Sequence, residues 1–98
     1  MIDIVRMITI STAHISEDTA CRLNVASLTN DMFSLVIYAK EGYGWFIAWN
    51  SDDEDWCNDE TIPTDLRECI EYAIKHDCQW LCLDVDGIET NELPVYDW

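Results

Sequence analysis

The sequence predicts a single α+β domain in which two helices cover one face of a four-stranded antiparallel sheet. Two segments repeat apolar residues at helical spacing, and four short segments are rich in β-branched and aromatic residues. They follow one another as strand, helix, strand, strand, helix, strand, which is the β-α-β-β-α-β order of the ferredoxin-like arrangement. Since 98 residues suffice for one modest core, we expect one acidic domain over residues 1–98.

The first strand and the first helix are expected at the amino-terminal end. Residues 4–10 alternate imperfectly and are rich in β-branched side chains, which predicts a strand. Ser16 then precedes Glu17 and Asp18. Because a hydroxyl accepts first-turn N–H groups and carboxylates favour the positive end of a helix, a helix over residues 16–27 is predicted. Its inward stripe would consist of Thr19, Ala20, Leu23 and Ala26.

The centre of the chain predicts a hairpin. Residues 35–39 and 45–49 are short β-branched and aromatic runs, joined by residues 40–44. Two glycines in that short connection, Gly42 and Gly44, favour a tight turn between paired strands.

The second helix is expected to open at Pro63. Apolar residues then recur at steps of three and four, which is the signature of a helix with one buried face: Leu66, Cys69, Ile70, Ala73 and Ile74. The opposite, solvent-facing side would carry Asp65, Glu68 and Glu71.

The last strand and a docked tail complete the domain. Residues 80–85 form the fourth strand-like run, and Asp86 and Gly87 make a turn pair directly after it. The tail, residues 93–98, is apolar enough to pack against the body of the domain.

Charge is the property that most restricts function. Twenty Asp and Glu against five Lys and Arg give a net charge of −15, on a chain that is 49% hydrophobic. That apolar content predicts a folded domain rather than a disordered one, with a strongly negative surface. Direct nucleic-acid binding is disfavoured, because affinity for a phosphate backbone comes from Lys and Arg. We expect a basic protein partner instead.

The amino-terminal residues and the cysteine pattern both predict a cytoplasmic protein. Residues 1–10 are too short and too charged for a signal peptide or a membrane span, so a cytoplasmic protein is expected. An odd number of cysteines, without the regular spacings of small secreted domains, predicts mostly reduced and buried thiols. These cysteines are Cys21, Cys57, Cys69, Cys78 and Cys82.

Three segments resemble known chemical motifs but lack features that those motifs require. The run from Leu83 to Gly87 resembles the first motif of haloacid dehalogenase phosphatases, but those enzymes need a long domain after it and eleven residues follow here. Residues 52–55 lack the glycine of an EF-hand calcium loop. His76, Cys78 and Cys82 have the wrong spacing for a usual zinc site. We therefore expect no catalytic residue, no metal and no cofactor.

The carboxylates themselves are the candidate binding residues. Duplex DNA carries about one charge per 1.7 Å of axis, and a rigid domain presenting a comparable density would compete for a protein groove built for DNA. The predicted partner-binding residues lie in an acidic loop and on the second helix: Asp52, Asp53, Glu54, Asp55, Asp59, Glu60, Asp65, Glu68 and Glu71. Further carboxylates near the end of the chain are expected to add to this density: Asp84, Asp86, Glu89 and Glu92.

Several separated blocks carry a family resemblance. They are residues 10–19, 42–46, 62–67, 80–84 with Asp86 and Gly87, and 93–96. In these blocks the chain resembles a small domain of uncharacterised function carried by proteobacterial plasmids, prophages and genomic islands. The resemblance implies no activity for any residue. Small acidic proteins of mobile elements are often inhibitors of host defence, such as anti-restriction or anti-CRISPR proteins. By analogy, an origin in a mobile element supports the interpretation that this domain competes with DNA for a protein groove.

The function expected from the sequence is therefore that of an acidic DNA-mimicking inhibitor from a mobile element, such as a phage. Its partner would be a basic DNA-binding protein or nuclease subunit of a CRISPR-Cas or restriction system. The alternative is a protein-interaction or regulatory module anchored by aromatic residues, because Trp is enriched among residues that carry binding energy. The tryptophans considered for that role are Trp45, Trp49, Trp56 and Trp98.

Overall fold

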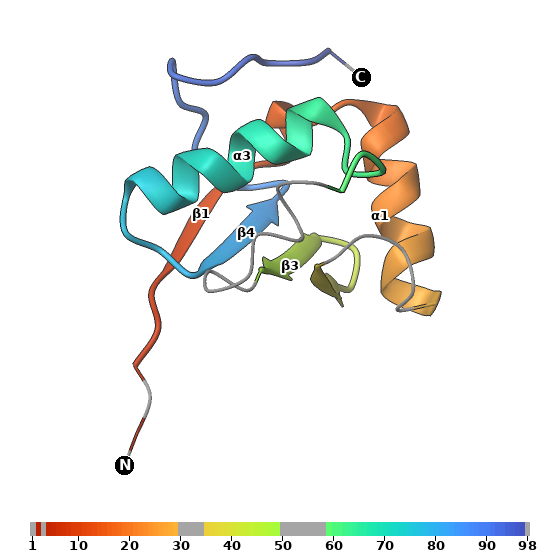
Figure 1. Cartoon of the computed structure of the whole chain (residues 1–98). Coiled ribbons are helices and arrows are strands. Elements are labelled where there is room, and N and C mark those ends of the chain that lie inside the picture. The colour runs from red at the N-terminus through yellow and green to blue at the C-terminus, as the bar shows by residue number, and fades with distance from the viewer. Residues whose placement is uncertain (1, 3, 30–34, 50–58, 98) are drawn as a thin grey trace.

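The computed structural model describes residues 2, 4–29, 35–49 and 59–97 of the chain (Figure 1). It shows a small α+β fold with two helices and a four-stranded sheet, as the sequence predicts. The elements are β1 (Met7–Ser11), the 3-10 helix η1 (Thr12–His14), α1 (Glu17–Thr29), β2 (Val36–Lys40), β3 (Gly44–Ala48), α3 (Thr64–Lys75) and β4 (Trp80–Asp84). In the described parts, no helix is long and apolar enough to span a membrane.

The sheet is mixed, so the expectation of a wholly antiparallel ferredoxin-like sheet is wrong. Its strand order is β1-β4-β3-β2. β1 pairs with β4 in parallel, whereas β4 with β3 and β3 with β2 are antiparallel. Strand periodicity specifies which side chains share a face but neither the neighbour nor the direction of a strand. The path through α3 brings β4 between β1 and β3, a position that element order alone does not determine.

One face of the sheet and both helices share a single core. In the strand registers, Ile10, Leu83 and Trp45 lie side by side, as do Leu81, Ile47 and Ile37. All six are buried, and the two helices pack against them from the same side (Figure 1). The predicted inward residues of α1 are confirmed as buried: Thr19, Ala20, Leu23 and Ala26. On α3 the predicted stripe holds for Leu66, Cys69, Ile70 and Ala73, but Ile74 is 43% exposed.

The start of α1 follows the capping chemistry that the sequence predicts. The Ser16 hydroxyl accepts a hydrogen bond from the Thr19 backbone N–H at 3.3 Å, and the Ser16 carbonyl accepts the Ala20 N–H at 3.0 Å. Ser16 is therefore the N-cap, and Glu17 and Asp18 occupy the first turn, where the helix dipole favours carboxylates.

The β2–β3 hairpin depends on its two glycines in different ways. Gly42 has a φ of 76° in the turn, and a Cβ there would meet nothing within 4 Å. Gly44 has a φ of 147°, and a Cβ there would lie 1.7 Å from the carbonyl oxygen of Leu83. Gly44 therefore permits the close approach of β3 to β4, whereas Gly42 serves only the turn.

The carboxy-terminal tail lies over the helical layer, where Figure 1 shows it passing above α3. The tail here means residues 88–97. Its Leu93 packs against the core, and the Tyr96 N–H donates to the Ala13 carbonyl at 2.8 Å. The prediction that the tail packs against the body is confirmed for the described residues. These described tail residues lie on the helical side of the sheet and not on its far face (Figure 1).

His14 fastens this tail to η1. Its ring is 1% exposed, with Nδ1 2.8 Å from the Pro94 carbonyl oxygen and Nε2 2.9 Å from the Thr90 backbone nitrogen. Because a carbonyl only accepts and an amide N–H only donates, Nδ1 carries the proton and Nε2 accepts. Because His14 is separated by 80 positions from Pro94 and by 76 positions from Thr90, both contacts depend on the fold.

Candidate functional site

The nine predicted partner-binding carboxylates separate into three groups. Asp52, Asp53, Glu54 and Asp55 lie outside the described residues. Asp59 and Glu60 lie directly before α3, with Glu60 exposed. The remaining three, Asp65, Glu68 and Glu71, lie on α3 itself, and they differ in what they contact.

Asp65 is a structural residue, which corrects the expectation that it faces solvent with Glu68 and Glu71. Its side chain is buried, and Oδ2 accepts the Ser16 backbone N–H at 2.7 Å while Oδ1 accepts the Thr19 hydroxyl at 2.8 Å. Both hydrogen bonds of this carboxylate link α3 to the start of α1. Asp65 is therefore not available to a partner.

Glu68 and Glu71 meet the tail carboxylate Glu92 in one groove. This α3–tail groove has a volume of about 300 Å³ and is also lined by Tyr72, Lys75 and Leu93. Lys75 Nζ and Glu92 Oε2 are 3.6 Å apart and both side chains are largely exposed. The structure thus brings two predicted residues together with one from the other end of the chain.

Tyr96 of the tail lies near Asp65 and Glu68. The pKa of Tyr96 is raised, chiefly by burial and further by the charges of Asp65 and Glu68. A negative charge on the tyrosine would be disfavoured beside those carboxylates.

All five cations of the chain are engaged by the chain itself. Three of them approach carboxylates: Arg6 with Asp77, Lys40 with Asp84, and Lys75 with Glu92. The other two donate to backbone carbonyls, Arg22 to Thr61 at 2.6 Å and Arg67 to Asp59 at 2.8 Å. These arginines hold residues 59–61, the segment that carries Glu60, against α1 and α3.

Asp84 is the second carboxylate that the fold removes from the surface. It is 9% exposed, and its Oδ2 accepts a hydrogen bond from Lys40 Nζ. That bond lowers the pKa of Asp84, helped by the Asp86 backbone N–H, and raises the pKa of Lys40. Asp84 was expected to add to the surface charge, and this expectation is wrong, whereas Asp86, Glu89 and Glu92 are exposed.

The far face of the sheet carries an aromatic patch, which we call the open sheet face. It is formed by Met7, Val36, Tyr38, Phe46 and Trp80, which alternate with the core residues along their strands. Tyr38 is 55% exposed and its ring stacks with that of Trp80, with centroids 6.3 Å apart. In the described parts of the chain, no helix covers this face (Figure 1).

The tryptophans named for the alternative function are placed elsewhere. Trp45 and Trp49 are 7% and 8% exposed and belong to the core, so they do not act as surface anchors. Trp56 and Trp98 lie outside the described residues. The stacked pair of exposed Tyr38 and partly buried Trp80 was not predicted, although each stands next to a core residue of its strand, Ile37 and Leu81, and so faces the other side of the sheet.

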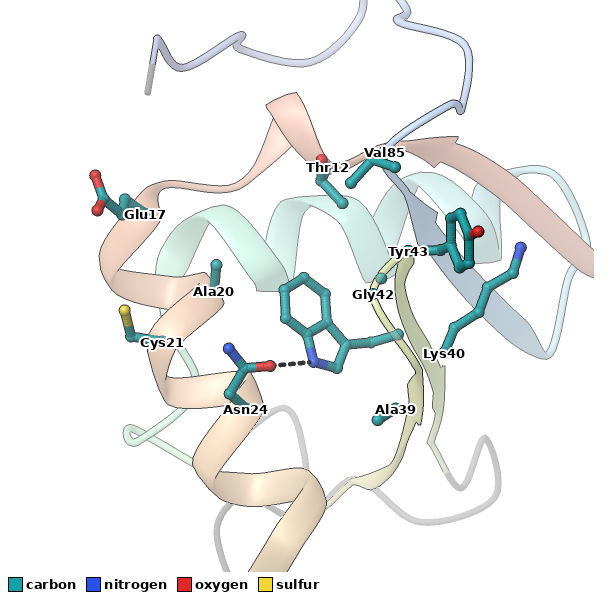
Figure 2. Close-up of a pocket in the computed structure, with 12 residues that line it drawn as sticks. Thr12, Glu17, Ala20, Cys21, Asn24, Ala39, Lys40, Gly42, Tyr43 and Val85 are labelled. Atoms are coloured by element: carbon teal, nitrogen blue, oxygen red, sulfur yellow. Dashed lines mark hydrogen bonds between the residues drawn. The ribbon is translucent and has the colours of Figure 1, made fainter.

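A second concavity lies between α1 and the hairpin (Figure 2). This Trp45 pocket has a volume of about 380 Å³. The indole Nε1–H of Trp45 donates to Asn24 Oδ1 at 3.2 Å, the bond that Figure 2 marks by a dashed line. Ala20 and Cys21 line it from α1, and Ala39 and Tyr43 from the hairpin.

Within the described residues, most of the cysteines are buried. Cys69, Cys78 and Cys82 are buried, Cys21 is exposed, and Cys57 lies outside the described residues. Burial, with the charges of Asp65 and Glu68, raises the pKa of Cys69 to about 12, which makes its thiol inert. Over residues 4–29, 35–49 and 59–97, no cluster of three or more His, Cys, Asp or Glu side chains is arranged to hold a metal ion.

The comparisons with known proteins assign a family without a function. No curated protein and no solved structure matches the chain. The model described as "Family of unknown function (DUF5983) C-terminal domain" matches residues 7–98, which is nearly the whole chain and includes every element of the fold. The chain therefore belongs to this family of uncharacterised domains.

Proposed function

We propose that this domain is a non-enzymatic inhibitor that mimics DNA. It binds a basic DNA-binding protein or nuclease subunit of a bacterial CRISPR-Cas or restriction system and occupies the surface that would hold DNA. A mobile element as its source and the cytoplasm as its site of action are parts of the same proposal.

The observation that carries this proposal is the state of the charges. All five Lys and Arg side chains are engaged within the chain, while Glu60, Glu71 and Glu92 are exposed. A partner would therefore meet exposed carboxylates, because each Lys and Arg side chain already contacts another group of the chain. Such a surface suits a groove lined by Lys and Arg and repels nucleic acid.

Rigidity supports the proposal as well. Glu68 and Glu71 lie on a packed helix, and Glu60 lies on the segment that Arg22 and Arg67 hold. Fixed charges lose less conformational freedom on binding than charges on a disordered chain. The sequence predicts that four further carboxylates belong to the same surface, and this stays a prediction: Asp52, Asp53, Glu54 and Asp55.

The test begins with capture of partners from a bacterial lysate at low and at high salt. The expected partner is a DNA-binding protein that elutes as salt rises and that duplex DNA displaces, because exposed charges are screened over about 8–10 Å at physiological salt. Retention that is independent of salt, or a captured partner that DNA does not displace, contradicts mimicry.

Variants then locate the surface. The triple variant E60K, E68K, E71K should abolish binding to the captured partner. A matched triple variant, D18K, E41K, D97K, has the same net charge and reverses exposed carboxylates that are not among the predicted binding residues. Equal loss in both variants would mean that total charge, and not the surface around α3, determines binding.

A second candidate function is supported by the open sheet face. The stacked pair of exposed Tyr38 and partly buried Trp80 suits an aromatic-anchored interaction module, whose complex would persist at high salt. Tyr38→Ser would then weaken binding strongly, whereas E60K, E68K, E71K would change it little. The two variants therefore distinguish the two candidates on the same partner.

A further inference from the structure

We infer that two copies of this domain associate through β1, by pairing the outer edges of their β1 strands in the antiparallel direction across a two-fold axis. The inference goes beyond the proposed function and does not rest on it. β1 is an edge strand, because the strand order is β1-β4-β3-β2 and its one paired strand among the described residues is β4. An edge strand presents backbone donors and acceptors with which another strand can pair.

Alternate backbone groups of this strand point away from the sheet. The Arg6 carbonyl accepts the Trp80 N–H at 3.1 Å, so it faces β4. In a parallel pair, every second residue of a strand bonds its neighbour with both the N–H and the C=O group. Ile8 therefore bonds β4, whereas Met7 and Thr9 direct both of their backbone groups outward.

The other end of the same edge is covered by the tail. The Ser11 N–H, which the alternation also directs outward, donates to the Ile88 carbonyl at 3.1 Å. That bond agrees with the outward direction of the odd-numbered residues. Among the residues that the structure describes, the outward groups of Met7 and Thr9 have no such partner. The unpaired part of the edge therefore precedes Ser11.

The chain directly before β1 adds exposed apolar side chains to this edge. Residues 4–6 continue from β1 past the end of the sheet (Figure 1). Ile4 is 85% exposed, Val5 56% and Met7 44%. Proteins usually protect an edge strand with Lys, Pro, a bulge or a covering segment. Residues 4–9 contain neither Lys nor Pro, so this edge keeps the properties of a pairing surface.

The local charge favours a second copy over a basic partner at this edge. Residues 4–9 contain no Asp or Glu, and their one charged side chain, Arg6, lies 3.6 Å from Asp77. A basic protein would therefore find no carboxylate to pair with along this strand, whereas two copies meet there without opposing carboxylates. The rest of each copy carries the net charge of −15, so the domains still repel each other and salt should strengthen the dimer.

The size of the interface sets the expected strength of the dimer. Residues 4–9 span about 20 Å of extended chain, at about 3.3 Å per residue. Pairing over that length gives a small interface, below about 1,200 Å² in total, which is typical of weak and transient association. We therefore expect a reversible dimer in exchange with the monomer.

The free backbone groups also determine the register. In an antiparallel pair, residues that direct both groups at the partner exchange both hydrogen bonds with the residue opposite. A two-fold axis at Met7 pairs that residue with Met7 of the second copy, and pairs Thr9 with Val5 of the second copy. This register ends before Ser11, whose N–H is already bonded. Because opposite side chains point to the same face, the two open sheet faces would form one continuous surface.

Sedimentation equilibrium of the full chain measures the association, over protein concentrations up to about 0.5 mM and at low and high salt. We expect a monomer–dimer equilibrium in which the dimer is at least about threefold tighter at high salt, because salt screens the repulsion between the two negative domains.

Two matched variants test the location. Met7→Lys should weaken the dimer about fivefold or more, because it places two like charges opposite each other and removes apolar contact. Val36→Lys makes the same change on β2, the other edge strand, at a residue that is 46% exposed and lies on the same face. It should change the association by less than about twofold.

Hydrogen exchange of the wild type, followed by NMR at low and at high protein concentration, tests the register without any variant. The Met7 and Thr9 amides should exchange more slowly as the dimer forms, because their N–H groups then have acceptors in the second copy. The Ile8 amide, which is bonded to β4 within each copy, should be protected equally at both concentrations.

Any of three results would overturn the β1 dimer. The first is a monomer at every concentration and salt, and the second is exchange of the Met7 and Thr9 amides that does not depend on concentration. The third is equal weakening by Met7→Lys and Val36→Lys, which would place the contact on the open sheet face instead. Salt distinguishes this dimer from the proposed function, because salt strengthens the dimer and weakens capture of a DNA-binding protein, so either can fail without the other.

Discussion

The Asp65 carboxylate accepts a hydrogen bond from the Thr19 hydroxyl at 2.8 Å, although the two residues belong to different helices and lie 46 positions apart. The same carboxylate accepts the Ser16 backbone N–H at 2.7 Å. In a capping box, a carboxylate or amide three residues into a helix bonds the N-cap N–H. Thr19 occupies that position here, and Asp65 of α3 supplies the carboxylate from outside the helix.

Asp65→Ala should lower the free energy of unfolding by about 2 kcal/mol, because it leaves the Ser16 N–H and the Thr19 hydroxyl without their buried acceptor. Urea denaturation measures the change. The control is Glu71→Ala on the exposed side of the same helix, which should stay within about 0.5 kcal/mol of the wild type. A loss in Asp65→Ala no larger than in the control would show that the carboxylate does not join the two helices.

His14→Ala should release the tail and cost about 3 kcal/mol of stability. It removes the acceptor of the Thr90 N–H and the donor to the Pro94 carbonyl, and it empties a fully buried site. Hydrogen exchange should show faster exchange of the Thr90 and Tyr96 amides. The control His76→Ala changes an exposed histidine and should leave these amides protected; tail amides equally protected in His14→Ala would refute the role.

Gly44→Ala and Gly42→Ala should differ sharply although both change a hairpin glycine. At Gly44 the new Cβ would overlap the Leu83 carbonyl oxygen, so a loss of about 3 kcal/mol or more is expected. At Gly42 the Cβ meets no atom within 4 Å, and only the left-handed backbone is unfavourable, at about 1–2 kcal/mol. Thermal or urea unfolding of the two variants measures the difference, and equal losses would contradict the close approach of β3 and β4.

The bond between Lys40 and Asp84 predicts a defined pH dependence. Because the folded pKa of Asp84 is lowered, its contribution to stability is present above the unfolded value, about 3.9, and is lost as pH falls below it. Because the folded pKa of Lys40 is raised, its contribution is present below about 10.4 and is lost as pH rises further. Between these limits the contribution is constant.

Urea denaturation of the wild type and Asp84→Asn at a series of pH values tests this prediction. The wild type should be more stable at neutral pH, and the difference should shrink as the pH falls below about 4. Asp97→Asn, which changes an exposed tail carboxylate, should differ little from the wild type at neutral pH. A difference for Asp84→Asn that stays the same at low pH would exclude the ion pair as its cause.

Local chemistry made much of the fold predictable. The Ser16 cap, the turn glycine Gly42 and the apolar residues of α1 and α3 each depend on neighbours within a few positions, and the structure confirms them except for the exposed Ile74. One signal was available but was not used. Residues 81–83 are apolar without alternation and all are buried, which is typical of a strand paired on both sides, and β4 is indeed central in the sheet.

The candidate site was less predictable because exposure depends on what packs against a side chain. Spacing on α3 placed Asp65 on the same side as Glu68 and Glu71, but α1 approaches its start and buries it. Glu92 joins Glu68 and Glu71 only because the tail returns over α3. Trp45 and Trp49 are buried in the core, Trp45 through its register in β3 and Trp49 directly after that strand, so neither is a surface anchor.

The amino-acid sequence by itself determined the large negative charge, the positions of the strands and helices and which helical residues face inward, since these follow from composition, periodicity and short-range hydrogen bonding. Only the tertiary structure decided that β1 and β4 run in parallel, that Asp65 and Asp84 are internal, and that the tail is fastened by His14. Those features join residues 40 or more positions apart, and they depend on how the chain returns upon itself.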